Sequence, residues 1–261
     1  MVTGGGSGIG RLMCLKLAAK GAVVVTWDVS EAGNGETVRQ VQAAGGQCRA
    51  YTVDLCDRQA VYAAATRLKQ EVGNVDVLVN NAGVVTGKSL MNSPDDSIQR
   101  TFDVNVLAHF WTTKAFMGHM LARNKGHIVN IASMAGKIVC SGLVDYCSSK
   151  HAAVGFHEAL QTELKAMGKY GVKTTCVCPV AISTGMFQGA GSKFFPTLTP
   201  DWVCRGGGGR NTHEHLHAVL AKLHVAHAAA DHAVPSKIHG HAGKYSGDAR
   251  LYEELCGQKQ D

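Results

Sequence analysis

Short runs of β-branched and other apolar residues alternate along most of the chain with longer stretches whose apolar residues recur at helical spacing. The short runs predict strands at residues 22–27, 48–53, 75–80, 127–131 and 173–178. The longer stretches predict helices at residues 9–20, 31–44, 58–72, 94–123 and 145–167.

Strict alternation of strands and helices predicts an α/β fold. Right-handed crossovers place such strands in a parallel sheet that helices cover on both faces. The strands are almost entirely apolar, as burial on both faces requires. With 261 residues, of which 45% are apolar, the chain can bury one sizeable core. We therefore expect a doubly wound parallel sheet in a single domain.

The pattern ends near residue 203. Residues 205–210 are a glycine run, and residues 204–261 contain only nine Leu, Ile, Val or Phe, which is too few for a confident buried element. We expect a domain over residues 1–203 and a poorly ordered, atypical Gly/His-rich tail over residues 204–261.

The tail holds eight of the 13 histidines, and three of them, His213, His215 and His217, alternate. A zinc site is conceivable there. These positions do not share one helical face, however, and no downstream Cys or carboxylate completes a recognisable set. A frame-shifted or alternatively spliced tail is the favoured interpretation, and a metal-binding module is the alternative.

Charge and composition exclude several classes of protein. The net charge of +6 is dispersed without a basic run, which argues against nucleic-acid binding. No apolar stretch approaches the ~20 residues of a membrane span, and the start is not a signal peptide, so the chain reads as soluble and cytoplasmic. Nine cysteines without a secretory signal predict reduced thiols; the close pair, Cys176 and Cys178, is too tightly spaced for a Cys-x-x-Cys site.

A glycine-rich segment, residues 3–10 (TGGGSGIG), leads into the first predicted helix. Glycines let the backbone approach a pyrophosphate, whose charge then rests on the helix N-terminus, although a glycine cluster alone is weak evidence of this. Asp28 closes the next strand, 18 residues after Gly10, where a carboxylate can bind the adenosine ribose and repel a 2′-phosphate. With no Arg or Lys nearby in sequence, this predicts a Rossmann-type site for NAD rather than NADP. The alternative for Asp28 is a turn or helix N-cap residue, a role that Ser30 could fill.

Tyr146 and Lys150 stand four residues apart on one face of a predicted helix. A tyrosine with a pKa near ~10 is a poor base. We expect the Lys150 ammonium and an oxidised nicotinamide to lower that pKa by about 2–3 units. In isolation, this spacing is more often an exposed helix face, so its meaning depends on the rest of the chain.

Together these motifs resemble the short-chain dehydrogenase/reductase family over about residues 2–203. Six motifs occur in the family's order: the glycine loop, Asp54 after a strand, residues 80–83 (NNAG), Asn105, Ser133 ahead of Tyr146 and Lys150, and residues 179–184. The resemblance implies that Tyr146 is the general base of alcohol oxidation and that Ser133 binds the substrate oxygen. It implies that Lys150 binds the nicotinamide ribose and that Asn105 holds a proton-relay water. The cofactor-binding residues it implies are Gly4, Ser7, Gly8, Ile9, Gly10, Asp28, Asp54, Asn81, Ala82, Gly83, Tyr146, Lys150, Ile182 and Thr184. Asp54 would meet the adenine, Asn81 and Gly83 would line the adenosine side of the cleft, and Ile182 and Thr184 would contact the carboxamide. The less specific interpretations are a strand-end turn for Ser133 and a polar kink in the helix at 94–123 for Asn105.

Finer matches are similar to the membrane-associated branch of retinol dehydrogenases and 17-beta-hydroxysteroid dehydrogenases. They include residues 104–116 (VNVLAHFWTTKAF), 145–150 (DYCSSK) and 184–187 (TGMF). The branch implies a lipophilic alcohol, with all-trans-retinol favoured over a steroid, a homodimer, and a place at the endoplasmic reticulum or lipid droplets. Within the expected substrate loop, residues 183–200, several side chains would suit an apolar substrate or ordinary lid packing: Met186, Phe187, Phe194, Phe195 and Leu198.

The chain departs from the family at its start, where only Met1 and Val2 precede Thr3 instead of a full strand and an anchor. Four or five missing buried apolar residues, at ~1.5–3 kcal/mol each, are comparable with the ~5–15 kcal/mol stability of a domain. We therefore expect a truncated first strand and poor folding. A catalytically inactive fragment that acts only through protein contacts is the alternative of a different class.

Overall fold

The structure is a computed structural model, and it describes residues 1–179. The expected substrate loop at 183–200, the tail at 204–261 and the histidines within it lie outside the described residues.

Six parallel strands form one sheet in the order β3-β2-β1-β4-β5-β6. The predicted α/β, Rossmann-type doubly wound sheet is therefore confirmed. The strands are β1 (Val2–Thr3), β2 (Val23–Asp28), β3 (Gln47–Thr52), β4 (Val77–Asn80), β5 (Gly126–Ile131) and β6 (Val172–Val177).

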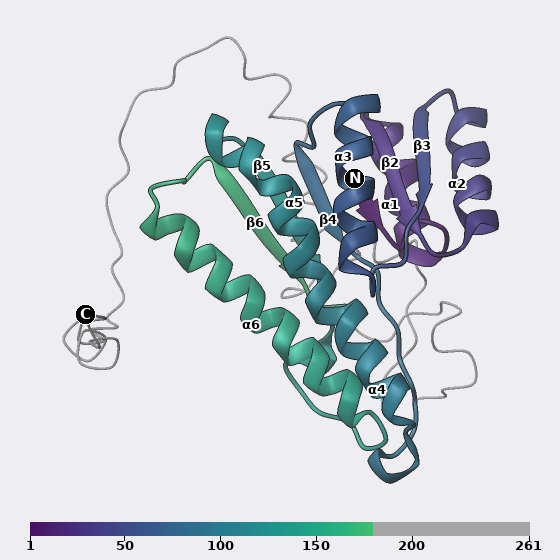
Figure 1. Cartoon of the computed structure of the whole chain (residues 1–261), viewed down its shortest axis with the longest axis vertical. Coiled ribbons are helices and arrows are strands. Elements are labelled where there is room, and N and C mark those ends of the chain that lie inside the picture. The colour runs from purple at the N-terminus through teal and green to yellow at the C-terminus, as the bar shows by residue number, and fades with distance from the viewer. Residues whose placement is uncertain (180–261) are drawn as a thin grey trace, which may run out of the picture.

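Helices cover both faces of this sheet (Figure 1). Three short helical turns accompany them: η1 (Leu90–Asn92), η2 (Asp103–Leu107, π-helical) and η3 (Met134–Gly136). The α-helices are α1 (Gly8–Ala18), α2 (Glu31–Ala43), α3 (Arg58–Glu71), α4 (Asp95–Phe102), α5 (Ala108–Arg123) and α6 (Val144–Ala166).

Neighbouring residues of the inner strands β4 and β5 pack into different cores. In β4, Leu78 joins a core with α3, α5 and α6, whereas Val79 joins a second core with α1 and α2. In β5, Ile128 and Val129 divide in the same way. The side chains of a strand alternate between the two faces of a sheet. Burial on both faces is the reason that the strands read as continuous apolar runs.

The centre of the sheet is held by the first three residues. Val2 is fully buried and pairs with both β2 and β4. The amino group of Met1 donates to the Val77 carbonyl at 2.8 Å, and the Met1 carbonyl accepts from the Val79 amide at 2.9 Å. The prediction of a short first strand in a central position is confirmed, and the expectation of poor folding stays a prediction.

The predicted helix at 94–123 is interrupted by a π-helical turn. The turn, η2, lies between α4 and α5 and carries Asn105, which is fully buried. Figure 1 shows that α4 and the adjoining ends of α5 and α6 extend past the carboxyl ends of the strands. Among residues 1–179, none of the helices has the length and apolar character to span a membrane.

Candidate active site

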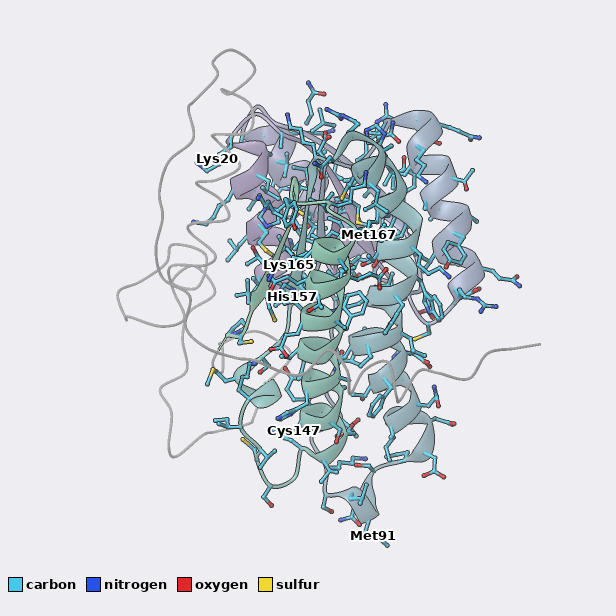
Figure 2. The ribbon with its side chains drawn as sticks, turned by 90° about the vertical axis from the view of Figure 1, so that its left-hand side faces the viewer. Lys20, Met91, Cys147, His157, Lys165 and Met167 are labelled. Carbon is cyan, nitrogen blue, oxygen red and sulfur yellow. The ribbon has the colours of Figure 1, made fainter. Side chains whose placement is uncertain are left out.

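The sequence-predicted residues gather at the carboxyl edge of the sheet. This is where open α/β sheets bind their ligands, because each strand there gives way to a loop. Asp28 ends β2, Asn80 ends β4, and Ser133 follows β5 by two residues. Figure 2 shows Cys147 at the first turn of α6, which extends away from the strands, and Lys165 near its last turn, beside them. The first turns of α6 thus bring Tyr146 and Lys150 toward the same edge.

The glycine loop is shaped to admit a pyrophosphate. Gly4 and Gly8 have φ of +65° and +51°, in the left-handed region that favours glycine. A Cβ on Gly10 would collide with the carbonyl oxygen of Gly4, so this position accepts no side chain. Ser7 is the N-cap of α1 and makes no side-chain capping bond, which leaves amide groups at the start of the helix to a ligand. The loop therefore fits a dinucleotide phosphate, with Ile9 in the first turn of α1.

Arg11, which was not predicted from the sequence, stabilises the glycine loop through hydrogen bonds. Its Nη2 donates to the carbonyls of Gly6 and Gly33, and its Nε donates to Thr37 Oγ1 at 2.9 Å. Thr37 Oγ1 in turn donates to the Gly5 carbonyl at 2.8 Å. The only sequence signal was that Arg11 directly follows the last glycine of the loop, because its partners on α2 are distant in sequence.

Asp28 lies against the glycine loop. Its Oδ2 accepts from the Gly6 amide and its Oδ1 accepts from the Ser30 amide, both at 2.9 Å. Ser30 is the N-cap of α2 and accepts from the Gly33 amide at 3.0 Å. Of the two alternatives for Asp28, the N-cap is wrong because Ser30 fills that role, whereas the turn is present because Asp28 Oδ1 accepts from the amide two residues on. The half-buried carboxylate is left at the loop, where an adenosine ribose would be recognised.

The residues expected near the adenosine occupy the ends of β3 and β4. Asp54, exposed after β3, accepts from the Cys56 amide at 3.0 Å. The Asn81 side chain donates to the Thr3 carbonyl at 2.9 Å and to the Gly4 carbonyl at 3.3 Å. Thr3 Oγ1 accepts from the Asn81 and Ala82 amides at 2.9 and 3.0 Å. Thr3 thus ties the Asn81–Gly83 segment to the glycine loop.

Asn105 joins two sides of the site. Its Oδ1 accepts from the Val84 amide at 2.9 Å, and its Nδ2 donates to the Val84 carbonyl and to Ser149 Oγ, both at 3.0 Å. Ser149 Oγ donates to the Tyr146 carbonyl at 2.8 Å. Asn105 therefore links the segment after β4 to the helical turn that carries Tyr146 and Lys150.

Ser133, Tyr146 and Lys150 converge as the sequence predicts. Ser133 is extended and accepts from the Ala135 amide at 3.1 Å, and its side chain also shares a hydrogen bond with Tyr146. The Lys150 ammonium donates to the Ile131 carbonyl at 3.1 Å and lies 5.7 Å from the centroid of the Tyr146 ring. Both Tyr146 and Lys150 are almost fully buried.

Burial sets the protonation of this pair. It raises the pKa of Tyr146 to about 12, and the hydrogen bond from Ser133 opposes this only in part. It lowers the pKa of Lys150 to about 8. The Lys150 ammonium lies beside the ring and donates to the Ile131 carbonyl. The expectation that Lys150 and an oxidised nicotinamide together lower the pKa of Tyr146 stays a prediction.

His109, on α5, is a second buried group near Lys150 that sequence reasoning missed. Burial, reinforced by the charge of Lys150, lowers the pKa of His109 to about 3, so the imidazole is neutral. Within the described part of the chain neither ring nitrogen has a hydrogen-bond partner. The imidazole meets the Phe156 ring edge to face, with centroids 5.9 Å apart.

Two of the predicted cofactor contacts, Ile182 and Thr184, and the apolar substrate-loop residues between Met186 and Leu198 lie outside the described residues. The structure therefore describes the residues that are expected to bind the pyrophosphate and the adenosine and those expected to be catalytic. Their roles stay predictions, as do the carboxamide and lid contacts.

Comparisons with known proteins agree with this geometry. Residues 1–193 match the family model described as short chain dehydrogenase. Short-chain dehydrogenase/reductase family 16C member 6 of Bos taurus is 45% identical over 87% of this chain and 73% of its own length. Epidermal retinol dehydrogenase 2 of Mus musculus is 42% identical over 100% of this chain and 85% of its own. Estradiol 17-beta-dehydrogenase 11 of Mus musculus is 48% identical over 78% of this chain and 68% of its own.

Solved structures lead to the same family. A metagenomic short-chain oxidoreductase in complex with NADP is 34% identical, with a TM-score of 0.65, and the match covers 69% of this chain and 82% of that one. A gluconate 5-dehydrogenase from Beutenbergia cavernae with bound NADP is 30% identical, with a TM-score of 0.70, over 77% and 83% of the two chains. The chain belongs to the short-chain dehydrogenase/reductase family of oxidoreductases, in the branch of the retinol and 17-beta-hydroxysteroid dehydrogenases.

Proposed function

We propose that the protein oxidises a lipophilic alcohol with NAD, and that all-trans-retinol is the preferred substrate. The observation that carries the proposal is the convergence of Ser133, Tyr146 and Lys150 at the edge of the sheet that also holds the glycine loop. The relative named as a retinol dehydrogenase supports the choice of substrate.

The preference for NAD rests on Asp28. A carboxylate held at the glycine loop by the Gly6 amide favours ribose hydroxyls and disfavours a 2′-phosphate. The guanidinium of Arg11, which folding brings to this loop, already bonds to the Gly6 and Gly33 carbonyls and to Thr37. Because these bonds occupy its Nε and Nη2, we expect Arg11 to support the loop rather than to bind a 2′-phosphate.

The residues of the site have separable roles. When bound, oxidised NAD would supply a hydride acceptor and a positive charge that favours the deprotonated form of Tyr146. Ser133, which is anchored by the Ala135 amide and shares a hydrogen bond with Tyr146, orients the substrate hydroxyl. Tyr146, in its deprotonated form, receives the proton of that hydroxyl. Lys150 supports the ribose, and Asn105 fixes the turn of α6 that presents both residues.

Oestradiol is the second candidate substrate. It is favoured by the 48% identity to a relative named estradiol 17-beta-dehydrogenase. A kcat/KM for retinol that exceeds the value for oestradiol would support our choice. A higher kcat/KM for oestradiol would make the steroid the preferred substrate. The proposed NAD-dependent oxidation would be unaffected by that result.

The test is reduction of NAD by purified protein with each alcohol, compared with reduction of NADP. Tyr146→Phe is expected to abolish turnover, by at least about a hundredfold, because it removes the proton acceptor. Tyr170→Phe is the matched control, since Tyr170 is 67% exposed and precedes β6, at the opposite end of that strand from the site. Turnover that survives Tyr146→Phe would refute the mechanism, and faster reduction of NADP would refute the cofactor assignment.

We also propose a homodimer formed through α5 and α6. Phe110, on α5, is 40% exposed and meets the Phe156 ring of α6 edge-on, with centroids 4.6 Å apart. Aromatic side chains are enriched at interfaces. Sedimentation of wild type and Phe110→Ala is the test: a wild-type monomer at micromolar concentration would exclude the dimer.

A further inference from the structure

The end of β6 carries two cysteines on one face. Cys176 and Cys178 alternate across Val177, and both pack, half-buried, against Ala132 and the α6 residues Ala153 and Val154. Their Sγ atoms are 3.9 Å apart and in hydrogen-bond contact. All seven cysteines of the described residues are free thiols, and this pair shares a direct contact.

The two thiols differ in acidity because of that contact. A hydrogen bond from Cys176 lowers the pKa of Cys178, and the charges of Lys137 and Lys150 act in the same direction. The same interaction, together with burial, raises the pKa of Cys176. The pair therefore presents a more acidic thiol, Cys178, with a second thiol in contact with it, the arrangement that reactive and resolving cysteines require.

The spacing of the pair allows an intrastrand bond. Two positions along a parallel strand span about 6.6 Å between Cα atoms. This lies inside the ~4.4–6.8 Å range of disulfides, near its upper limit. To bond, the sulfurs must close from 3.9 Å to the S–S length of about 2.05 Å, which draws the strand together across Val177.

Val177 and Pro179 hold the catalytic serine in place. The Ala132 amide donates to the Val177 carbonyl at 2.8 Å, and the Met134 amide donates to the Pro179 carbonyl at 2.9 Å. These two bonds fix the residues on either side of Ser133. A disulfide that shortens the backbone between Cys176 and Cys178 therefore shifts the carbonyls that hold the residues on either side of Ser133.

We propose that Cys176 and Cys178 form an oxidisable dithiol, and that closing it to a disulfide displaces Ser133 and switches off the dehydrogenase site. The oxidant is a peroxide. Cys178 thiolate attacks one peroxide oxygen, the O–O bond breaks, and the leaving hydroxide takes a proton to become water, which leaves Cys178 as a sulfenic acid. Cys176 then attacks the Cys178 sulfur and forms the S–S bond, and the sulfenic hydroxyl leaves as a second water with the Cys176 proton. Two thiols lose two electrons and one peroxide gains them.

Mass spectrometry tests the bond itself, independently of any activity. Trypsin cleavage after Lys173 and Lys193 places both cysteines in one peptide, residues 174–193, without a third cysteine. After hydrogen peroxide treatment and alkylation of remaining thiols, we expect this peptide to lose two hydrogen atoms and to resist alkylation until it is reduced. Residues 138–150 form the internal control, because that peptide holds the exposed Cys140 and the buried Cys147. Full alkylation of 174–193, or equal pairing within 138–150, would overturn the proposal.

Turnover tests the effect on Ser133, and this part rests on the proposed function. Peroxide is expected to lower NAD reduction by the wild type at least about tenfold, since displacements near 1 Å in an active site have effects of this size. Dithiothreitol should restore the rate, and Cys178→Ser should keep its rate in peroxide. A disulfide that forms without loss of turnover would overturn the switch. If the untreated protein lacks turnover, the proposed function fails, and the peptide measurement still decides whether the pair closes.

Discussion

The tightest packing in the glycine loop is at Gly10, and Gly10→Ala is expected to weaken both the fold and cofactor binding. The new Cβ would overlap the Gly4 carbonyl, lying 2.8 Å from its carbon and 2.7 Å from Asn81 Nδ2. Backbone atoms cannot rotate away as a flexible side chain can. Overpacking of this kind costs about 1–3 kcal/mol, whereas alanine in a helix gains about 0.5–1 kcal/mol over glycine. We expect a net loss of about 1–2 kcal/mol.

Gly35→Ala is the matched control on α2, because a Cβ there meets nothing within 4 Å. The same substitution should therefore stabilise the protein by about 0.5–1 kcal/mol. Urea unfolding measures the change in stability for both substitutions. Titration with NAD measures the affinity of Gly10→Ala, which we expect to be about 10- to 100-fold weaker because the loop must shift. Equal stabilisation by the two substitutions, with unchanged NAD affinity, would refute the packing derived for the loop.

Three further predictions concern polar groups with hydrogen bonds inside the protein. Arg11→Met removes the hydrogen bonds to Gly6, Gly33 and Thr37 and should lower the free energy of unfolding by about 2–4 kcal/mol. The control Arg39→Met changes an exposed arginine, and its free energy of unfolding should stay within about 0.5 kcal/mol of wild type. Equal effects of the two substitutions would contradict the stabilisation of the glycine loop by Arg11. Asn105→Ala leaves the Val84 groups and Ser149 without their partner and should lower turnover at least about tenfold, whereas the exposed Asn92→Ala should leave turnover unchanged. Lys150 has a pKa lowered from 10.5 to about 8, so between these values the unfolded chain binds the proton that the folded protein has released. Wild-type stability should therefore rise with pH by up to about 3 kcal/mol across this window relative to Lys150→Met. Parallel pH curves for the two proteins would contradict the lowered pKa of this buried lysine.

Local patterns were enough to predict most elements of the fold. The strand predicted at 127–131 is found at Gly126–Ile131, and the helix predicted at 58–72 is found at Arg58–Glu71. Both succeed because apolar spacing is fixed by the faces that an element buries. The same spacing cannot show the π-helical turn at Asp103–Leu107, because the side-chain bonds from Asn105 to Val84 and Ser149 cross between segments distant in sequence.

The active site shows the same difference between what local sequence patterns can and cannot predict. Asp28 could be located from its place at the end of a strand after the glycine loop, and Ser133, Tyr146 and Lys150 from the order of motifs that the chain shares with the family. The effect of burial on their pKa values could not be predicted, because solvation depends on how deeply the fold buries each group, as the raised pKa of Tyr146 shows. Arg11 was missed for a related reason, since its partners are carbonyls brought near it by the packing of α1 on α2.

Asn105 shows that a structural and a functional interpretation of one residue can both hold. Its position in a π-helical turn agrees with a kink in the helix. Both of its amide N–H groups are engaged, by the Val84 carbonyl and by Ser149, so its side chain has no donor left for a substrate or a relay water. Any water held at this residue must therefore bind the backbone or the remaining acceptor capacity of Oδ1. The side chain itself acts through Ser149 on the turn that carries Tyr146, so the kink is the means by which Asn105 serves the chemistry.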